Sequence, residues 1–245
     1  MQVLKESWRK YLVVVASPAL LLVVVAITSG SSTGTQRQLA TPPRPPDPVR
    51  RTFALLTGIP QHGTVLGYRK APVTLQFFGD LQCLDSRRVM LGALPFLIRR
   101  FVRAGKLKIR FRSTETDTKG AGGWYEFRAQ QTAALAAGKQ DKLWNFIDVF
   151  YREQGPEFTG YVTEDFLEKI AMQAGIDLER WSQDRVPFQE DWLELSETDE
   201  NLAAVKQLES TPAFLIGRSG GPARRLLHYS LDEPKVFEEA IAELL

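Results

Sequence analysis

Cysteine and histidine are nearly absent from this chain, which has one cysteine, Cys83, and two histidines among 245 residues. A single cysteine excludes a disulfide bond within the chain, and two histidines leave too few ligands for a Cys/His zinc site. A charge excess is lacking as well, because 31 lysines and arginines face 29 aspartates and glutamates for a net charge of +2. No large basic field indicates nucleic-acid binding. We therefore expect no metal, no cofactor and no nucleic-acid partner.

Long apolar runs are missing from most of the chain, and the mean hydropathy of −0.19 is too polar for several membrane spans. The exception is residues 12–28, which read LVVVASPALLLVVVAIT without a charged residue. As a helix this run extends over roughly 26 Å, close to the thickness of a bilayer core. Three basic residues precede it, so the positive-inside rule places residues 1–10 in the cytoplasm and the rest outside. We predict a single transmembrane signal anchor over residues 11–28.

Two other interpretations of residues 11–28 stay open, a cleaved signal peptide and a buried helix of a soluble protein. The apolar run is longer than the roughly 7–15 residues usual in cleaved signals, and no A-x-A triplet follows it. An uncleaved anchor is therefore the favoured interpretation, and it places the C-terminal domain on the extracytoplasmic side of the membrane.

Residues 29–51 have the composition of a linker. They begin with SGSSTGT, which is flexible, and five prolines follow between Pro42 and Pro48. A proline cluster of this kind adopts extended polyproline II geometry. We expect it to hold the downstream domain, residues 52–245, away from the bilayer.

The remaining residues, 52–245, have the length of one domain. Apolar periodicity predicts strands at 53–57, 64–66, 73–78, 106–112, 213–216 and 224–228, and helices from Cys83 to Gly105, at 124–138, 142–152, 163–174 and 201–208, and from Glu233. The order β-α-β, then a helical insert at about 124–208, then β-β-α is typical of an α/β or α+β domain with a mixed sheet. Pro95 is expected to kink the first of these helices.

Cys83 lies between the apolar strand at 73–78 and the helix that follows it. A thiol at the start of a helix is near unpaired backbone N–H groups and the positive end of the helix dipole. This environment favours the thiolate and therefore a nucleophile. A structural cysteine is the alternative, but such cysteines lie more often inside an apolar run.

Two segments of the chain resemble the DsbA-like thioredoxin-fold family. Residues 71–83, APVTLQFFGDLQC, look like the strand and loop that lead into the family's active site, and 94–98 and 102–105 are similar to its first helix. The second segment, residues 210–217 with the sequence STPAFLIG, resembles the family's cis-proline segment. The resemblance covers 61–245 and implies a thioredoxin-like fold with a helical insertion.

The resemblance also implies roles for individual residues. Cys83 matches the family's nucleophilic cysteine, and Thr211 and Pro212 are expected to pack beside it. A cis bond before Pro212 leaves the backbone of Thr211 free to pair with an extended substrate. Asp80 matches an acid that is common just before the family's cysteine.

The chain departs from the family at the position of the second cysteine. Where the family has Cys-x-x-Cys, this sequence reads Cys83-Leu84-Asp85-Ser86. A lone thiol stores no disulfide of its own, but it still forms mixed disulfides that an external thiol must resolve. Ser86 is placed to donate a hydrogen bond to the thiolate, whereas the charge of Asp85 is expected to raise the thiol pKa. The net direction of the shift stays open at this point.

Three functions follow as hypotheses. The first is a membrane-anchored, extracytoplasmic thiol–disulfide exchange protein that acts through one cysteine on exported proteins or low-molecular-weight thiols and disulfides. The second is a redox-inactive thioredoxin-fold module that binds a peptide or protein. The third is a structural subunit of an envelope assembly. The thiol pKa and the capture of disulfide-linked partners distinguish the first from the second.

Overall fold

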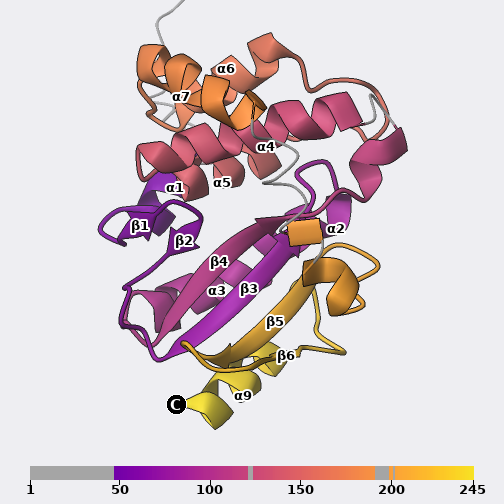
Figure 1. Cartoon of the computed structure of the whole chain (residues 1–245). Coiled ribbons are helices and arrows are strands. Elements are labelled where there is room, and N and C mark those ends of the chain that lie inside the picture. Colours follow the sequence, from indigo (N-terminus) through magenta and orange to yellow (C-terminus); the bar gives the residue numbers. More distant parts are fainter. Residues whose placement is uncertain (1–46, 121–123, 191–198, 201) are drawn as a thin grey trace, which may run out of the picture. The chain divides into compact units, whose positions relative to one another are not determined.

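A six-stranded mixed sheet with the strand order β1-β2-β4-β3-β5-β6 forms the centre of the fold (Figure 1). Its strands are β1 Gln61–His62, β2 Val65–Leu66, β3 Val73–Gly79, β4 Leu107–Ser113, β5 Ala213–Arg218 and β6 Ala223–Arg225. The structure, a computed structural model, describes residues 47–120, 124–190, 199–200 and 202–245. Strand β3 pairs in parallel with β4 and antiparallel with β5.

The helices fall into a group that covers the sheet and a group that forms the insert. They are α1 Pro48–Leu56, α2 Leu84–Leu91, α3 Ala93–Leu97, the π-helix η1 Ile98–Val102, the 3-10 helix η2 Asp117–Gly120, α4 Trp124–Lys139, α5 Leu143–Glu153, α6 Glu164–Gln173, α7 Leu178–Glu190 and α9 Lys235–Leu244. Figure 1 shows α4, α5, α6 and α7 grouped at one end of the sheet. The mixed sheet and this helical insert confirm the predicted fold class for the domain of residues 52–245.

Alternation along the central strands places buried apolar residues on both faces of the sheet, with Phe78 and Leu215 in a smaller cluster of their own. Phe77 of β3 lies opposite Phe111 of β4 and Phe214 of β5, and all three rings are buried. The Phe77 and Phe214 rings stack with their centroids 5.3 Å apart. The ring of Phe237 of α9 packs edge-on against Phe214, with a centroid distance of 4.9 Å. Aromatic pairs of this geometry add to the stabilisation from buried apolar area.

The predicted strand at 53–57 is wrong, because residues 53–56 belong to helix α1. Asp47 caps this helix through a hydrogen bond from the Val49 backbone N–H at 3.0 Å, and Pro48 occupies the first turn. An acidic N-cap followed by proline is a strong helix start. Proline-rich composition hid this signal, and a short apolar run does not distinguish a strand from a helix. The helix also begins inside the range 29–51 that composition assigned to the linker.

The helix predicted from Cys83 to Gly105 is interrupted at Gly92, three residues before the proline that was expected to kink it. Pro95 has no N–H to donate to the carbonyl of Leu91, so the regular ladder cannot continue across this turn. At the break, the backbone N–H of Ala93 donates instead to the carbonyl of Leu231 at 3.2 Å. The chain then resumes as α3 and the π-helix.

In the insert, several sequence-based helix boundaries are confirmed. Thr163 caps α6 by accepting a hydrogen bond from the Phe166 backbone N–H at 3.2 Å, and Gly175 ends this segment with φ of 73°. Periodicity predicts no separate helix between 163–174 and 201–208, where the structure has α7. The predicted anchor over residues 11–28 lies outside the described residues. Among the helices that are described, none is both long and apolar enough to cross a membrane.

Candidate functional site

Cys83 is the N-cap residue of α2, at the point where the loop after β3 turns into the helix. Its backbone N–H donates to the carbonyl of Asp80 at 3.1 Å, and its own carbonyl accepts from Arg87 N–H at 3.0 Å. This geometry confirms the predicted position of the cysteine between a buried strand and a helix. Cys83 is buried, with only 4% of the residue exposed to solvent.

The Cys83 thiol and the Thr211-Pro212 dipeptide lie next to each other at one end of the inner strands β3 and β5. Strands β3 and β5 are antiparallel neighbours, so the end of β3 and the start of β5 lie side by side. The peptide bond between Thr211 and Pro212 is cis. The Cys83 thiol donates to the carbonyl oxygen of Thr211 at an Sγ–O distance of 3.4 Å. Cys83 and the Thr211-Pro212 dipeptide, which are far apart in the sequence, are therefore neighbours in the fold, as predicted.

The backbone around the dipeptide is held by neighbouring hydroxyl groups. Thr116 and Thr211 share a hydrogen bond between their hydroxyl oxygens at 2.5 Å. The phenol of Tyr229 donates to the carbonyl of Pro212. These contacts fix the strand start on both sides of the cis bond, so the Thr211 carbonyl stays beside the thiol.

Asp80 is fully buried and organises the loop before the cysteine. Its carboxylate accepts five hydrogen bonds, from the backbone N–H groups of Gln82, Thr116 and Thr118, from the Thr118 hydroxyl and from the Gln130 amide. Buried carboxylates are retained when donors satisfy them in this way. Asp80 therefore connects the thiol loop to the segment after β4 and to α4, and it makes no hydrogen bond to the thiol.

The end of helix α5 holds the same loop from the side of the insert. The buried Tyr151 phenol donates to the backbone carbonyl of Asp80 at 3.1 Å, and the Gln154 amide reaches the carbonyl of Cys83 at 3.3 Å. In the other direction, the Arg87 guanidinium donates to the backbone carbonyl of Tyr151 at 2.8 Å. The site thus lies where the sheet and the insert meet.

Burial is the main influence on the Cys83 thiol, and it raises its pKa from an ordinary value near 9 to about 11. A hydrogen bond with Asp117 raises the pKa further, while the side chain of Thr211 and the backbone and side chain of Ser86 lower it. The expected preference for thiolate at the helix start is therefore outweighed by desolvation. At neutral pH the thiol is protonated.

Ser86, which replaces the family's second cysteine, is fully buried beside the site. Its backbone N–H and its hydroxyl both lower the pKa of Cys83, as expected of donors that favour the thiolate. Among the described residues, its hydroxyl oxygen makes no hydrogen bond of normal geometry. Asp85 points to solvent, where Arg88 lies 3.5 Å from its carboxylate. The acid that raises the thiol pKa is Asp117 rather than Asp85.

A cavity of about 610 Å³ opens beside the thiol, and Cys83 and Thr211 both line it. Five of its ten lining residues are acidic: Asp85, Glu115, Asp117, Glu157 and Glu209. The other lining residues are uncharged, so this part of the described chain presents one sign of charge to the thiol. A molecule bound in this cavity would lie against Cys83 and Thr211.

Of these five acids, only Asp85 belongs to a motif that marks it in the sequence. Asp117 and Glu115 follow β4, and Glu157 follows α5. No local pattern marks these positions, because only the fold brings their segments together. Glu209 could have been identified as a site residue from the sequence, because it lies two residues before Thr211.

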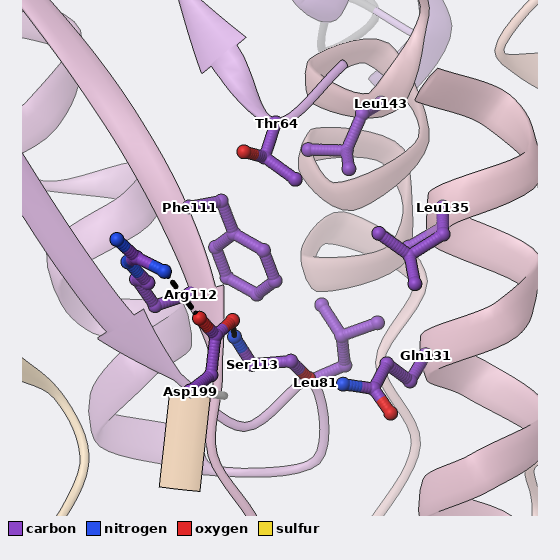
Figure 2. A pocket seen from close by; sticks show the side chains of 10 residues that line it. Thr64, Leu81, Phe111, Arg112, Ser113, Gln131, Leu135, Leu143 and Asp199 are labelled. Carbon is purple, nitrogen blue, oxygen red and sulfur yellow. Dashed lines mark hydrogen bonds and ion pairs between the residues drawn. The ribbon is translucent and has the colours of Figure 1, made fainter. Parts of the chain in front are cut away.

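A second cavity, of about 190 Å³, lies between β4 and the insert (Figure 2). Figure 2 shows Phe111, Leu135 and Leu143 turned toward it, with the ion pair between Arg112 and Asp199, 2.5 Å long, at its edge. Neither Cys83 nor Thr211 lines this cavity. It therefore contains no group that reacts with a disulfide. Within the described residues, no cluster of three His, Cys, Asp or Glu side chains is arranged to hold a metal ion.

A cysteine at a helix start beside a cis-proline, on a mixed sheet whose β3 is parallel to β4 and antiparallel to β5, is typical of the thioredoxin class of folds. The family model described as thioredoxin matches residues 60–220, and the chain belongs to this family. Relatives named as disulfide bond formation proteins, and solved structures of DsbA-like proteins, resemble the chain as well.

The chain is 28% identical over 121 residues to the probable disulfide bond formation protein D of Bacillus anthracis and 27% identical over 121 residues to that of Bacillus cereus. These alignments cover 49% of this chain and 54% of each relative, so the chain matches about half the length of these curated proteins. The resemblance to DsbA-like proteins stated from the motifs is therefore confirmed.

Solved structures share the fold at low sequence identity. BdbD from Bacillus subtilis, in its oxidised form, superposes with a TM-score of 0.60 at 21% identity and covers 76% of this chain and 96% of its own. The alpha-DsbA1 of Wolbachia pipientis gives a TM-score of 0.58 at 19% identity, with 79% of this chain and 94% of its own covered. At these identities the likeness shows the fold.

Proposed function

We propose that this protein is a membrane-anchored, extracytoplasmic thiol–disulfide exchange protein that works through the single thiol of Cys83. The observation that carries the proposal is the 3.4 Å contact between Cys83 Sγ and the Thr211 carbonyl, inside one open cavity. Membership of the thioredoxin family and the likeness to disulfide bond formation proteins support it.

The exchange step follows from the presence of one thiol. Cys83 loses its proton and its sulfur attacks one sulfur of a substrate disulfide, so that a Cys83–substrate disulfide forms and the substrate bond breaks. The other substrate sulfur leaves as a thiolate and takes up a proton. A low-molecular-weight thiol from outside the protein then attacks the substrate sulfur of the mixed disulfide, so that a disulfide between this thiol and the substrate forms, and Cys83 leaves as a thiolate and takes up a proton. Ser86 has no thiol with which to release the partner, so the mixed disulfide persists until that second thiol arrives.

The backbone beside Pro212 supplies the docking surface in this proposal. Thr211 and Pro212 would bind an extended stretch of an exported protein next to the thiol, in the manner of strand addition. Asp80 and its five donors keep the loop rigid, so that the thiol and the docking backbone hold a constant separation. Isomerisation, reduction of mixed disulfides and removal of small thiol adducts are all reactions that this arrangement allows.

The location in the proposal comes from the sequence outside the described residues. Residues 11–28 would anchor the protein with residues 1–10 in the cytoplasm, and the linker would carry the domain outside. After alkaline carbonate extraction, the full chain should stay in the membrane pellet, and protease added to spheroplasts should digest the C-terminal domain. Release into the soluble fraction, or protection from the protease, would contradict this location.

Partner trapping in cells that express the full chain tests the chemistry. Wild-type protein should accumulate disulfide-linked partners on non-reducing gels, and Cys83→Ala should accumulate none. In Ser86→Cys a second thiol releases the partner, so its trapped bands should be weaker than those of wild type. Identical band patterns in wild type and Cys83→Ala would disprove exchange through Cys83.

One observation favours a second candidate, a binding module without redox activity. Burial raises the pKa of Cys83 to about 11, which leaves little thiolate at neutral pH. In this case the same cavity would hold a peptide or a protein without a covalent step. Partner capture that is unchanged by Cys83→Ala, with no disulfide-linked bands in either protein, would establish this function in place of exchange.

A further inference from the structure

The cavity around Cys83 presents acidic side chains to whatever binds there, and we infer that it selects positively charged substrates. These are extended peptides with lysine or arginine beside a cysteine, or small disulfides with amino groups. The inference rests on the proposed exchange function and adds the charge of its substrate.

The acids reach the cavity from separate parts of the fold. Asp85 lies in the first turn of α2, Asp117 at the start of η2, Glu157 after α5, and Glu209 just before Thr211. A molecule whose sulfur approaches Cys83 therefore meets carboxylates on several sides. Thr211 also lines the cavity, so the carboxylates border the backbone that a peptide would pair with.

Local cations do little to neutralise these carboxylates. The guanidinium of Arg88 is 3.5 Å from Asp85 but lies closer to Asp232, at 2.7 Å. Glu157 accepts a hydrogen bond from the Leu84 backbone N–H at 2.9 Å. No described lysine or arginine forms an ion pair with Glu157 or Glu209. A bound cation is thus the group that would complete the charge balance.

The acidity is a property of this cavity rather than of the molecule, whose net charge is +2. On the sheet surface, a separate hollow of about 300 Å³ is lined by Lys108, Arg110, Arg112 and Arg218 and by no acid. The two signs of charge are therefore separated within the domain. Charge of one sign in a concave site raises the local concentration of the opposite ion and repels like charge.

A substrate cation also changes the reaction itself. Asp117 contacts the thiol and favours its protonated form. An ammonium or guanidinium group held beside Asp117 offsets that carboxylate and stabilises the developing thiolate. The cavity would then react fastest with the class of substrate that it attracts, and a bound anion would have the reverse effect.

Three small disulfides that share the same CH2CH2–S–S–CH2CH2 core test the inference on the purified full chain. They are cystamine with two ammonium groups, bis(2-hydroxyethyl) disulfide without charge, and 3,3′-dithiodipropionate with two carboxylates. The rate of adduct formation at Cys83 is followed by intact mass, and each rate is divided by that of the urea-unfolded chain to remove intrinsic reactivity. We expect cystamine to react about tenfold faster than the neutral disulfide and the dianion about tenfold slower, with most of the difference lost in 0.5 M salt.

A charge-neutralised variant and a matched control locate the effect. Asp85→Asn combined with Glu209→Gln should lower the ratio of the cystamine rate to the dithiodipropionate rate by about tenfold. Glu168→Gln combined with Glu239→Gln removes the same charge from exposed positions away from the cavity and should leave the ratio unchanged. Equal losses in both double variants would overturn the inference, because the selection would then come from net charge.

The outcomes also separate this inference from the proposed exchange function. If all three disulfides react at equal normalised rates, exchange stands and charge selection is overturned. If none of the three disulfides reacts, the proposed exchange function is disproved. Binding of fluorescent peptides to Cys83→Ala then tests whether the cavity still selects positively charged ligands. Tighter binding of a lysine-rich peptide than of a glutamate-rich peptide of the same length supports the acidic selection, and equal or absent binding overturns it.

Discussion

At the scale of single residues, the reactivity of Cys83 is a balance between burial and a few polar contacts. Desolvation and Asp117 raise the thiol pKa, whereas Thr211 and Ser86 lower it. The first pair is stronger, so the resting protein holds a protonated thiol that becomes more reactive as the pH rises. Small changes at its contacts should therefore alter the rate of its reactions measurably.

Asp117→Asn should lower the pKa of Cys83, because the carboxylate that favours the protonated thiol is removed. We expect a decrease of about half a unit to one unit, which makes alkylation by iodoacetamide about three- to tenfold faster at pH 8. The rate is measured by intact mass across the pH range. Asp165→Asn, an equal charge change on the exposed face of α6, should have no effect. An unchanged or higher pKa in Asp117→Asn would show that the contact has the opposite role.

Sequence alone located Cys83, Ser86, Thr211 and Pro212, because their motifs are contiguous and the resemblance assigns them an order. It also marked Asp80, although the five hydrogen bonds of this carboxylate could not be foreseen from one position in a motif. The positions of Asp117 and Glu157 at the site could not be predicted from the sequence. The direction in which the pKa of Cys83 shifts could not be predicted either. Burial depends on segments far apart in the chain, and only the fold brings them to the thiol.

At the scale of elements, the helix after Cys83 is two helices joined at Gly92. The break orients α2, which carries the thiol at its start, independently of α3, which packs against the sheet. Pro95 prevents the helical ladder from continuing, and a tertiary hydrogen bond from the Ala93 backbone N–H to the carbonyl of Leu231 holds the chain at the break. Periodicity alone predicted one continuous helix, because the apolar positions keep their spacing on both sides of the break.

Gly92→Ala should destabilise the protein by about 1–3 kcal/mol, because a Cβ atom at this position lacks space. It would lie 2.8 Å from the carbonyl oxygens of both Arg88 and Leu231, which are backbone atoms. Urea unfolding gives the difference in free energy. Gly221→Ala is the matched control, since its Cβ would meet only the Arg218 carbonyl, at 3.5 Å. Equal stability of the two variants would mean that the backbone at Gly92 adjusts without cost.

At the scale of the whole molecule, the order of strands and helices predicted a mixed-sheet domain with a helical insert, and the resemblance around Cys83 and Pro212 implied its thioredoxin-like fold. The docking of the insert was not predictable. It depends on contacts such as the Trp144 indole N–H to the Thr64 carbonyl at 3.1 Å, which join distant segments. The separation of an acidic cavity from a basic sheet surface is likewise invisible in a net charge of +2.

The raised pKa of Cys83 predicts a loss of stability in alkaline solution. The unfolded thiol ionises first as the pH increases, so the folded state is penalised between about pH 9 and about pH 11. A shift of this size corresponds to a loss of about 2–3 kcal/mol once the pH reaches the upper value. Other buried groups, Tyr151 among them, also titrate in alkali, so the prediction concerns the difference between wild type and Cys83→Ser in urea unfolding. A difference that does not change with pH would contradict the buried thiol.

The most direct test of exchange through Cys83 is the pH dependence of mixed-disulfide formation with the neutral bis(2-hydroxyethyl) disulfide, followed by intact mass. A thiol with a pKa of about 11 should give one adduct, absent in Cys83→Ala, whose rate rises about tenfold per pH unit and shows no plateau below about pH 10.5. No adduct at any pH would contradict exchange through Cys83. A plateau at or below pH 8.5 would contradict the buried, acid-lined thiol on which the account depends.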